Sequence, residues 1–178
     1  TGFRIIYLQT GYVRIEGLEL DGSGLSAATS ARGILVLESL SNVGDIRIDS
    51  MIIHDLHTTQ GTYLYETSIG ILDYHDADTE GPPLHITNNI IYDITNTLDQ
   101  GHVAGIHVGA RGTSYVSNNT VYSILNKPSC ALASCGPAWG IYAKSYGTGT
   151  VTVIATNNYV GNVQAVDTYA DCYGAIDG

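Results

Sequence analysis

Ile86-Thr-Asn-Asn-Ile-Ile91 decides the fold of this chain of 178 residues, because four other segments of the sequence align with it without an insertion or deletion. The other copies are Ile15-Glu-Gly-Leu-Glu-Leu20, Ile48-Asp-Ser-Met-Ile-Ile53, Val116-Ser-Asn-Asn-Thr-Val121 and Ala155-Thr-Asn-Asn-Tyr-Val160. Successive copies start 33, 38, 30 and 39 residues apart. Constant segments separated by variable spacers indicate a repeat protein in which each repeat supplies one structural unit.

A second series of dipeptides alternates with the first: Gly33-Ile34, Gly70-Ile71, Gly105-Ile106 and Gly140-Ile141, with Ala165-Val166 as a looser member. Both series are short and rich in β-branched residues, which is typical of strands. We therefore predict an all-β solenoid of about five coils with three parallel sheets, in one domain covering residues 1–178.

Three stacks of strands follow from this alignment. The first contains 3–8, 33–38, 70–75, 105–110, 140–145 and 165–170; the second 13–16, 46–49, 84–87, 114–117 and 151–156; the third 18–20, 51–54, 90–92, 120–122 and 159–161. Because side chains alternate across a strand, the recurring aliphatic positions should face a common core. These positions are Ile15, Ile48, Ile86, Val116, Leu20, Ile53, Ile91, Val121, Val160, Ile34, Ile71, Ile106 and Ile141.

Two columns of turn residues separate the expected strands. The first, a turn ladder, contains Gly17, Ser50, Asn88, Asn118 and Asn157, and the second contains Gly22, Asp55, Asp93, Ser123 and Asn162. Glycine and asparagine adopt left-handed backbone conformations at the least cost, as a sharp bend between two strands requires. Stacked asparagine side chains can also bond to one another and to the backbone of neighbouring coils.

The Asn-Asn turns and the Gly-Ile strand starts resemble the pectate-lyase-like family of right-handed parallel β-helices over nearly the whole chain. The family's asparagine ladder maps onto Asn88, Asn118 and Asn157 and departs at Gly17 and Ser50. The resemblance implies the fold but no single activity, because the family includes lyases, hydrolases, phage tailspikes, adhesins and surface proteins.

Charge, cysteine content and the N-terminal residue indicate which partners and which cellular location to expect. The net charge of −10 disfavours binding to nucleic acid, and no apolar run approaches the length of a membrane span. A disulfide between Cys130 and Cys135 is plausible in an oxidising compartment, with two free thiols as the alternative. The start at Thr1, without Met, favours processed material, so we expect a secreted or surface location.

A surface for glycans is expected on the outer face of the Gly-Ile sheet, where family enzymes hold saccharides. Its candidate contacts are Tyr74, His107, Arg111, Tyr142 and Lys144. Tyrosine rings stack on sugars, and basic or acidic side chains can move protons. However, outward positions of a solenoid are normally polar or aromatic for solubility alone. The sequence contains no catalytic motif, so we assign no catalytic residue and lean against an enzyme.

No metal centre or other cofactor is expected. The acidic group Asp73, Asp76, Asp78 and Glu80 could hold Ca²⁺, but its spacing is not that of an EF-hand, and a solvated loop explains it better. His54 and His57 have the spacing of a metal pair. His54 occupies the column of Tyr92 and Tyr122, and His57 enters a loop, so we interpret both as surface residues.

The leading functional hypothesis is an extracellular structural subunit that associates head to tail into a filament or surface fibre. No capping helix is evident at either end, and uncovered strand edges invite pairing with another chain. The interface candidates are Phe3, Ile5, Tyr7, Val166, Tyr169 and Cys172. The alternatives are a polysaccharide lyase or glycoside hydrolase fragment and a non-catalytic glycan-binding adhesin module.

Overall fold

The computed structural model describes residues 2–25, 30–36, 44–59, 66–74, 81, 83–97, 101–109, 112–126, 136–144 and 150–165. These residues form fifteen β-strands and no helix. The strands are β1 (Phe3–Leu8), β2 (Val13–Glu16), β3 (Glu19–Asp21), β4 (Ala31–Val36), β5 (Ile46–Asp49), β6 (Ile52–Thr58), β7 (Glu66–Asp73), β8 (Leu84–Thr87), β9 (Ile90–Asn96), β10 (His102–Val108), β11 (Gly112–Ser117), β12 (Thr120–Asn126), β13 (Ala138–Ala143), β14 (Val151–Thr156) and β15 (Tyr159–Ala165).

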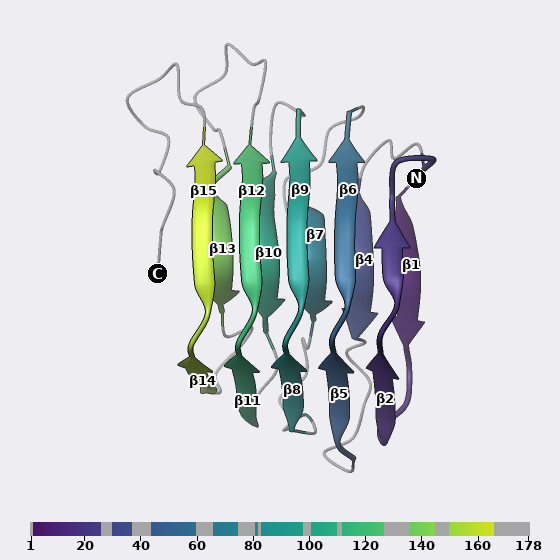
Figure 1. Ribbon diagram of the computed structural model, residues 1–178, viewed down its shortest axis with the longest axis vertical. Coiled ribbons are helices and arrows are strands. Elements are labelled where there is room, and N and C mark those ends of the chain that lie inside the picture. The colour runs from purple at the N-terminus through teal and green to yellow at the C-terminus, as the bar shows by residue number, and fades with distance from the viewer. Residues whose placement is uncertain are drawn as a thin grey trace.

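The strands form three five-stranded sheets, which confirms the predicted all-β solenoid with three parallel sheets (Figure 1). The first sheet has the order β1-β4-β7-β10-β13, the second β2-β5-β8-β11-β14 and the third β3-β6-β9-β12-β15. Every neighbouring pair for which a register is defined is parallel. The chain visits the three sheets in turn, so β1, β2 and β3 form the first coil and β13, β14 and β15 the last described coil.

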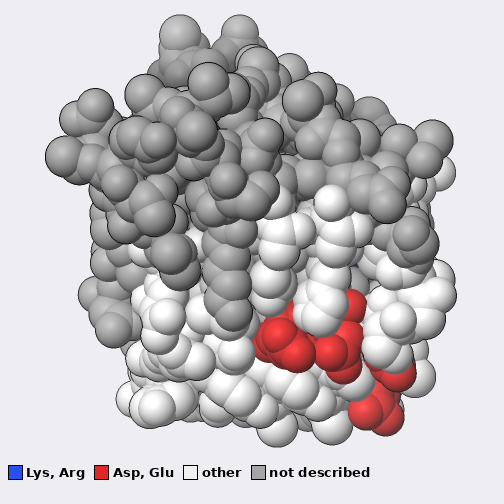
Figure 2. All heavy atoms as spheres, turned by 90° about the horizontal axis from the view of Figure 1, so that it is seen from above, with Lys and Arg blue, Asp and Glu red and all other residues white. Residues whose placement is uncertain are grey.

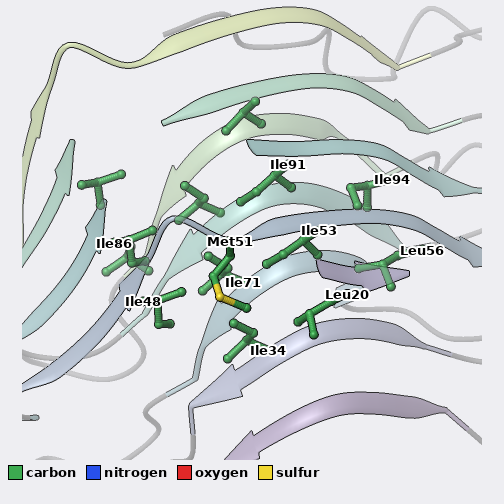
Figure 3. Close-up of a cluster of buried hydrophobic side chains, with 14 of the residues drawn as sticks. Leu20, Ile34, Ile48, Met51, Ile53, Leu56, Ile71, Ile86, Ile91 and Ile94 are labelled. Atoms are coloured by element: carbon green, nitrogen blue, oxygen red, sulfur yellow. The ribbon is translucent and has the colours of Figure 1, made fainter. Parts of the chain in front are cut away.

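The core is built from equivalent residues of successive coils. Ile48, Ile86 and Val116 are paired across the second sheet, and all three are fully buried. Ile53, Ile91 and Val121 form the matching column of the third sheet and are also fully buried. Figure 3 shows these isoleucines with Ile34 and Ile71 of the first sheet around Met51. The predicted core positions are therefore confirmed in the central coils, because alternation along short strands selects one face.

The first turn column adopts the left-handed conformation that its residue types favour. Gly17, Ser50, Asn88, Asn118 and Asn157 have φ values between 54° and 68°. The second column does the same at Asp55, Asp93, Ser123 and Asn162, with φ between 52° and 57°. These four residues interrupt the pairing register inside β6, β9, β12 and β15 rather than ending those strands. The third-sheet strands are therefore longer than predicted, because pairing resumes at Leu56, Ile94 and Ile124, which return to the core.

The hydrogen-bonded asparagine ladder lies one residue after the positions to which we assigned it. Asn89 and Asn119 are almost fully buried, whereas Asn88 and Asn118 are exposed. The Asn119 Oδ1 atom accepts hydrogen bonds from the backbone N–H and the Nδ2 of Asn89, at 3.0 and 2.9 Å. Asn158 serves Asn119 in the same way. The correction has a simple cause: the turn residue points outward, and its successor points into the bend, where backbone groups need partners.

A column of glycines brings the first sheet close to the third. An added Cβ at Gly105 would lie 2.2 Å from Val121 Cγ1, and one at Gly70 would lie 2.6 Å from Ile91 Cγ2. These distances leave no room for a side chain, so the Gly-Ile pattern reflects close packing between sheets. The strands of the first sheet begin two to four residues earlier than predicted, at Ala31, Glu66, His102 and Ala138, because pairing extends upstream of each Gly-Ile pair.

Candidate functional site

The outer face of the first sheet is covered rather than open. His107 and Leu72 are fully buried, and Leu35 is 3% exposed. Leu72 and Leu35 belong to a second apolar cluster that includes Ile69 and Trp139, with Tyr74 and Tyr142 packed against it. The Trp139 and Tyr142 rings are stacked at 3.9 Å. The prediction that His107 faces solvent as part of a glycan surface is therefore wrong.

The other predicted glycan contacts do not form one open surface in the described residues. Tyr74 and Tyr142 are half-buried beside the second apolar cluster, and Lys144 is exposed at the end of β13. Arg111 lies outside the described residues, as do Asp76, Asp78 and Glu80 of the suggested Ca²⁺ group. Asp73, the remaining member of that group, is 2% exposed, so it is not part of a solvated loop.

The terminal coils differ from the central coils in burial. Ile15 and Val13 of β2 are half-buried, although their partners Ile48 and Ile46 in β5 are 0% and 1% exposed. At the other end, Ala155 of β14 is exposed although its partner Val116 is fully buried. Val160 and Ile141 are likewise only half-buried. The apolar core therefore reaches the surface at both described ends.

The predicted interface residues lie partly in this region. Phe3 and Ile5 of β1 are half-buried against the core, and Tyr7 is 39% exposed. Val166, Tyr169 and Cys172 lie outside the described residues, and so do Cys130 and Cys135 of the suggested disulfide.

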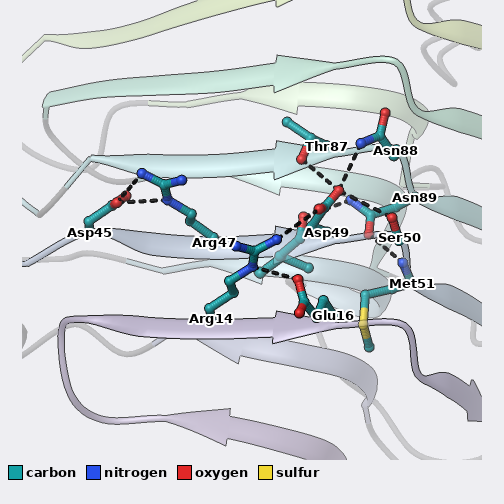
Figure 4. Close-up of polar contacts among 11 residues, drawn as sticks. Arg14, Glu16, Asp45, Arg47, Asp49, Ser50, Met51, Thr87, Asn88 and Asn89 are labelled. Carbon is teal, nitrogen blue, oxygen red and sulfur yellow. Dashed lines mark hydrogen bonds and ion pairs between the residues drawn. The ribbon is translucent and has the colours of Figure 1, made fainter.

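Polar side chains link the coils on the outside of the second sheet (Figure 4). The carboxylate of Asp49 accepts hydrogen bonds from Asn88 Nδ2 at 2.8 Å and Thr87 Oγ1 at 3.0 Å, both one coil away. The hydrogen bond from Asn88, with those from Thr87 and Ser50 and the charge of Arg14, outweighs desolvation and lowers the pKa of Asp49. Arg14 and Arg47 are adjacent but each has an acidic partner, Glu16 and Asp45 respectively. These contacts link successive coils, and Arg14, Asp45 and Arg47 also line an open pocket together with Tyr12 and Val13.

A column of stacked rings runs along the third sheet at His54, Tyr92 and Tyr122. The ring centroids are 4.9 and 5.1 Å apart, and the ring planes are nearly parallel. His54 is 7% exposed, so our interpretation of it as a surface residue is wrong. Its Nδ1 lies 2.6 Å from Asp55 Oδ2 and its Nε2 lies 3.1 Å from Glu19 Oε1.

Both ring nitrogens of His54 therefore face carboxylates, which an imidazolium satisfies by donating from each nitrogen. Burial acts to lower the pKa of His54. The hydrogen bonds to Asp55 and Glu19, with the charges of Asp55 and Asp21, outweigh burial and raise the pKa above its usual value. Carboxylates of the first and second coils thus favour the protonated form of His54.

A second histidine faces carboxylates beside this column. His57 lies within β6 rather than entering a loop, two residues after Asp55. Its Nε2 atom is 3.5 Å from Asp93 Oδ1 and 4.0 Å from Asp55 Oδ1. That nitrogen is shielded from solvent and makes no hydrogen bond with any described residue. The three ligand atoms lie within 4.8 Å of one another, as a shared metal ion would require.

This part of the surface is acidic. Glu19, Asp21, Asp55 and Asp93 lie on β3, β6 and β9, and the basic groups paired with them among the described residues are His54 and His57. In the view of Figure 2 the acidic side chains gather in one patch, with no Lys or Arg visible among the described residues. The sequence alignment already placed Asp55 and Asp93 in one column. The alignment did not show that the side chain of His57, two residues after Asp55, lies on the same side of β6 as the side chain of Asp55.

Comparisons with protein-family models, with curated proteins and with solved structures give no match for this chain. A search of the described residues also finds no helix long and apolar enough to cross a membrane.

Proposed function

We propose that this protein is an extracellular structural subunit whose first coil pairs with the last coil of a second copy, so that copies add head to tail into a fibre. The observation that carries the proposal is the loss of burial at equivalent core positions of the terminal coils, such as Ile15 against Ile48. Among the described residues, each strand of the two end coils pairs along one edge alone, and half-buried apolar residues beside such edges favour association through added strands.

The arrangement of the strands supports a second copy as the partner. The strands β1, β2 and β3 lie at one edge of the three sheets, and β13, β14 and β15 lie at the opposite edges. Adding a copy in the same orientation would extend all three parallel sheets together. The aliphatic columns would also continue, with Ile141 next to Ile6 and Val160 next to Leu20 in the neighbouring copy. Such an interface is heterologous, and it produces filaments unless the rotation closes a ring.

The charges of the two end coils are compatible with this contact. The outward residues of β2 include Arg14 and Glu16, which already form an ion pair. The equivalent positions of β14 are Ile154 and Thr156, which carry no charge. Stacking would therefore bring no like charges together in this column.

The proposal also includes two expectations from the sequence. One is that the solenoid has the right-handed pectate-lyase-like architecture suggested by the turn residues, and the other is that the protein is secreted.

The test is electron microscopy and sedimentation of the purified chain over a range of concentrations. Five strands per sheet at about 4.8 Å predict an axial repeat of about 24 Å, or slightly more with additional layers. Ile15→Asp should abolish the fibre. Ile90→Asp should not, because Ile90 is 40% exposed on the outside of a central coil. Circular dichroism of each variant shows whether the solenoid is retained.

Two results would overturn the proposal. One is a monomer at every concentration, which would mean that the end coils are covered by other parts of the protein. The other is a fibre that persists in a folded Ile15→Asp variant. Ile5→Asp provides a second change at the same end if Ile15→Asp fails to fold.

A further inference from the structure

We propose that His57, Asp55 and Asp93 form a binding site for a divalent transition-metal ion, with Zn²⁺ as its simplest occupant. The site is independent of end-to-end assembly, because it lies on the outer face of β6 and β9 in the second and third coils. Sequence reasoning assigned no metal to these residues. The geometry around the His57 Nε2 atom leads to the proposal.

The His57 Nε2 atom lacks the partner that a shielded polar atom normally has. It is shielded from solvent and makes no hydrogen bond with the described residues, and carboxylate oxygens of Asp93 and Asp55 lie 3.5 and 4.0 Å from it. Buried polar groups are rarely left unsatisfied, and a bound ion is one recognised explanation for those that lack a partner. A metal ion between the nitrogen and the two oxygens would satisfy all three atoms.

The distances fit a small cation. A tetrahedral ion with ligand bonds of about 2.0–2.1 Å holds its ligand atoms about 3.3–3.4 Å apart. The separation from His57 Nε2 to Asp93 Oδ1 is 3.5 Å, and that to Asp55 Oδ1 is 4.0 Å. Small side-chain rotations would therefore bring all three atoms into the coordination sphere. The side chains are 29–42% exposed, so water can reach the remaining position.

The donor set selects the class of metal. One imidazole nitrogen with two carboxylate oxygens suits Zn²⁺ and similar first-row ions. Ca²⁺ takes six to eight oxygen ligands, which three residues with one nitrogen do not supply. Two carboxylates also compensate the charge of a divalent ion, and neither forms an ion pair with a Lys or Arg of the described segments.

The neighbouring histidine orients the site without joining it. His54 Nδ1 lies 2.6 Å from Asp55 Oδ2, which leaves the Oδ1 atom directed toward His57. Metal-binding carboxylates are commonly fixed in this way by a hydrogen bond to their second oxygen. The backbone contributes as well, since Asp55 and Asp93 are equivalent residues of successive coils with φ of 56° and 53°. Their side chains therefore project from matching positions on adjacent strands.

The test is titration of the full chain with ZnCl₂ alone, followed by calorimetry. The wild-type chain should bind one Zn²⁺ at this site, and His57→Ala or Asp93→Asn should weaken that binding by at least tenfold. Asp93→Asn retains the shape of the side chain and tolerates positive φ, so it also guards against misfolding. Asp45→Asn is the matched control, because Asp45 pairs with His85 at 3.4 Å outside the site.

X-ray absorption of the zinc-loaded chain should show a nitrogen and oxygen shell with one imidazole. The proposal is overturned if the wild-type chain binds no Zn²⁺. It is equally overturned if binding persists unchanged in folded His57→Ala and Asp93→Asn variants, because the ion would then be held elsewhere. An absorption spectrum dominated by sulfur ligands would overturn it as well.

Discussion

Ile48 and Ile15 occupy the same position in adjacent coils, yet only Ile48 is fully buried. The difference does not come from the residue type or from the local strand. It comes from neighbours: Ile48 has a coil on each side, whereas Ile15 has a described coil on one side alone. In a solenoid, the contribution of a given side chain to the free energy of unfolding therefore depends on whether another coil packs beyond it.

The comparison extends to polar groups. Asn89 and Asn119 in the central coils each have an asparagine in the following coil as partner. The corresponding position of the second coil is Met51, whose backbone N–H still donates to Asn89 Oδ1 at 2.9 Å. Each central coil thus satisfies backbone groups of the coil before it, and removing one member should affect two coils at once.

The largest expected effect is the loss of core packing at Ile48. Ile48→Ala should lower the free energy of unfolding by about 4 kcal/mol, because a fully buried isoleucine leaves a cavity between two coils. Ile15→Ala should cost about 1–2 kcal/mol, because the half-buried side chain loses less contact. Urea unfolding at concentrations where the chain is monomeric measures both.

Equal losses for the two variants would contradict the difference in burial. If the cost of Ile15→Ala rises toward that of Ile48→Ala as protein concentration increases, a second copy covers the first coil. That result would connect the comparison directly to the proposed assembly.

The next effect concerns the asparagine ladder. Asn119→Ala should destabilise the chain by about 3 kcal/mol, because the backbone N–H of Asn89 and the carbonyl of Ile86 lose their partners in a buried bend. Its neighbour supplies the control. Asn118→Gly should change the unfolding free energy by less than about 1 kcal/mol, because Asn118 is exposed and glycine accepts its φ of 57°. A larger loss at Asn118 than at Asn119 would return the ladder to the position suggested by the sequence.

The sequence was sufficient to predict those features that depend on the residue type or on its neighbours along the chain. Positive φ at Asn88, Asn118 and Asn157 follows from residue type, and the burial of Ile86 follows from alternation along a short strand. In contrast, nothing local distinguishes the two residues of an Asn-Asn pair, so the buried member that bonds to the asparagine of the next coil could be identified only in three dimensions.

Two further features depend on distant parts of the chain. The outer face of the first sheet was expected to be exposed because enzymes of the family that the chain resembles hold saccharides there. His107 is nevertheless buried, and the ring of Tyr142 on the neighbouring strand lies 4.7 Å from its ring. The His57 site was missed for a related reason: alignment paired Asp55 with Asp93, but the distance from either carboxylate to His57 depends on side-chain direction.

The smallest expected effect tests what the first coil contributes outside the core. Glu19 and Asp21 of β3 lie near His54 of the second coil and help to raise its pKa. The folded chain therefore holds this proton more tightly than the unfolded chain does. The resulting stability is complete below the unfolded pKa of about 6.5 and is lost as the pH rises through the higher folded pKa.

Urea unfolding between pH 6 and pH 9 should therefore show a stability decrease that His54→Tyr removes. Tyrosine continues the ring column of Tyr92 and Tyr122 but does not titrate in the lower part of this range. Glu19→Gln should reduce the slope in part, because it removes one of the two hydrogen-bonding carboxylates. Glu16→Gln, an acidic residue of the same coil paired with Arg14, should leave it unchanged. An undiminished slope in His54→Tyr would mean that the first coil does not stabilise the second through this histidine, and that its contribution is confined to packing.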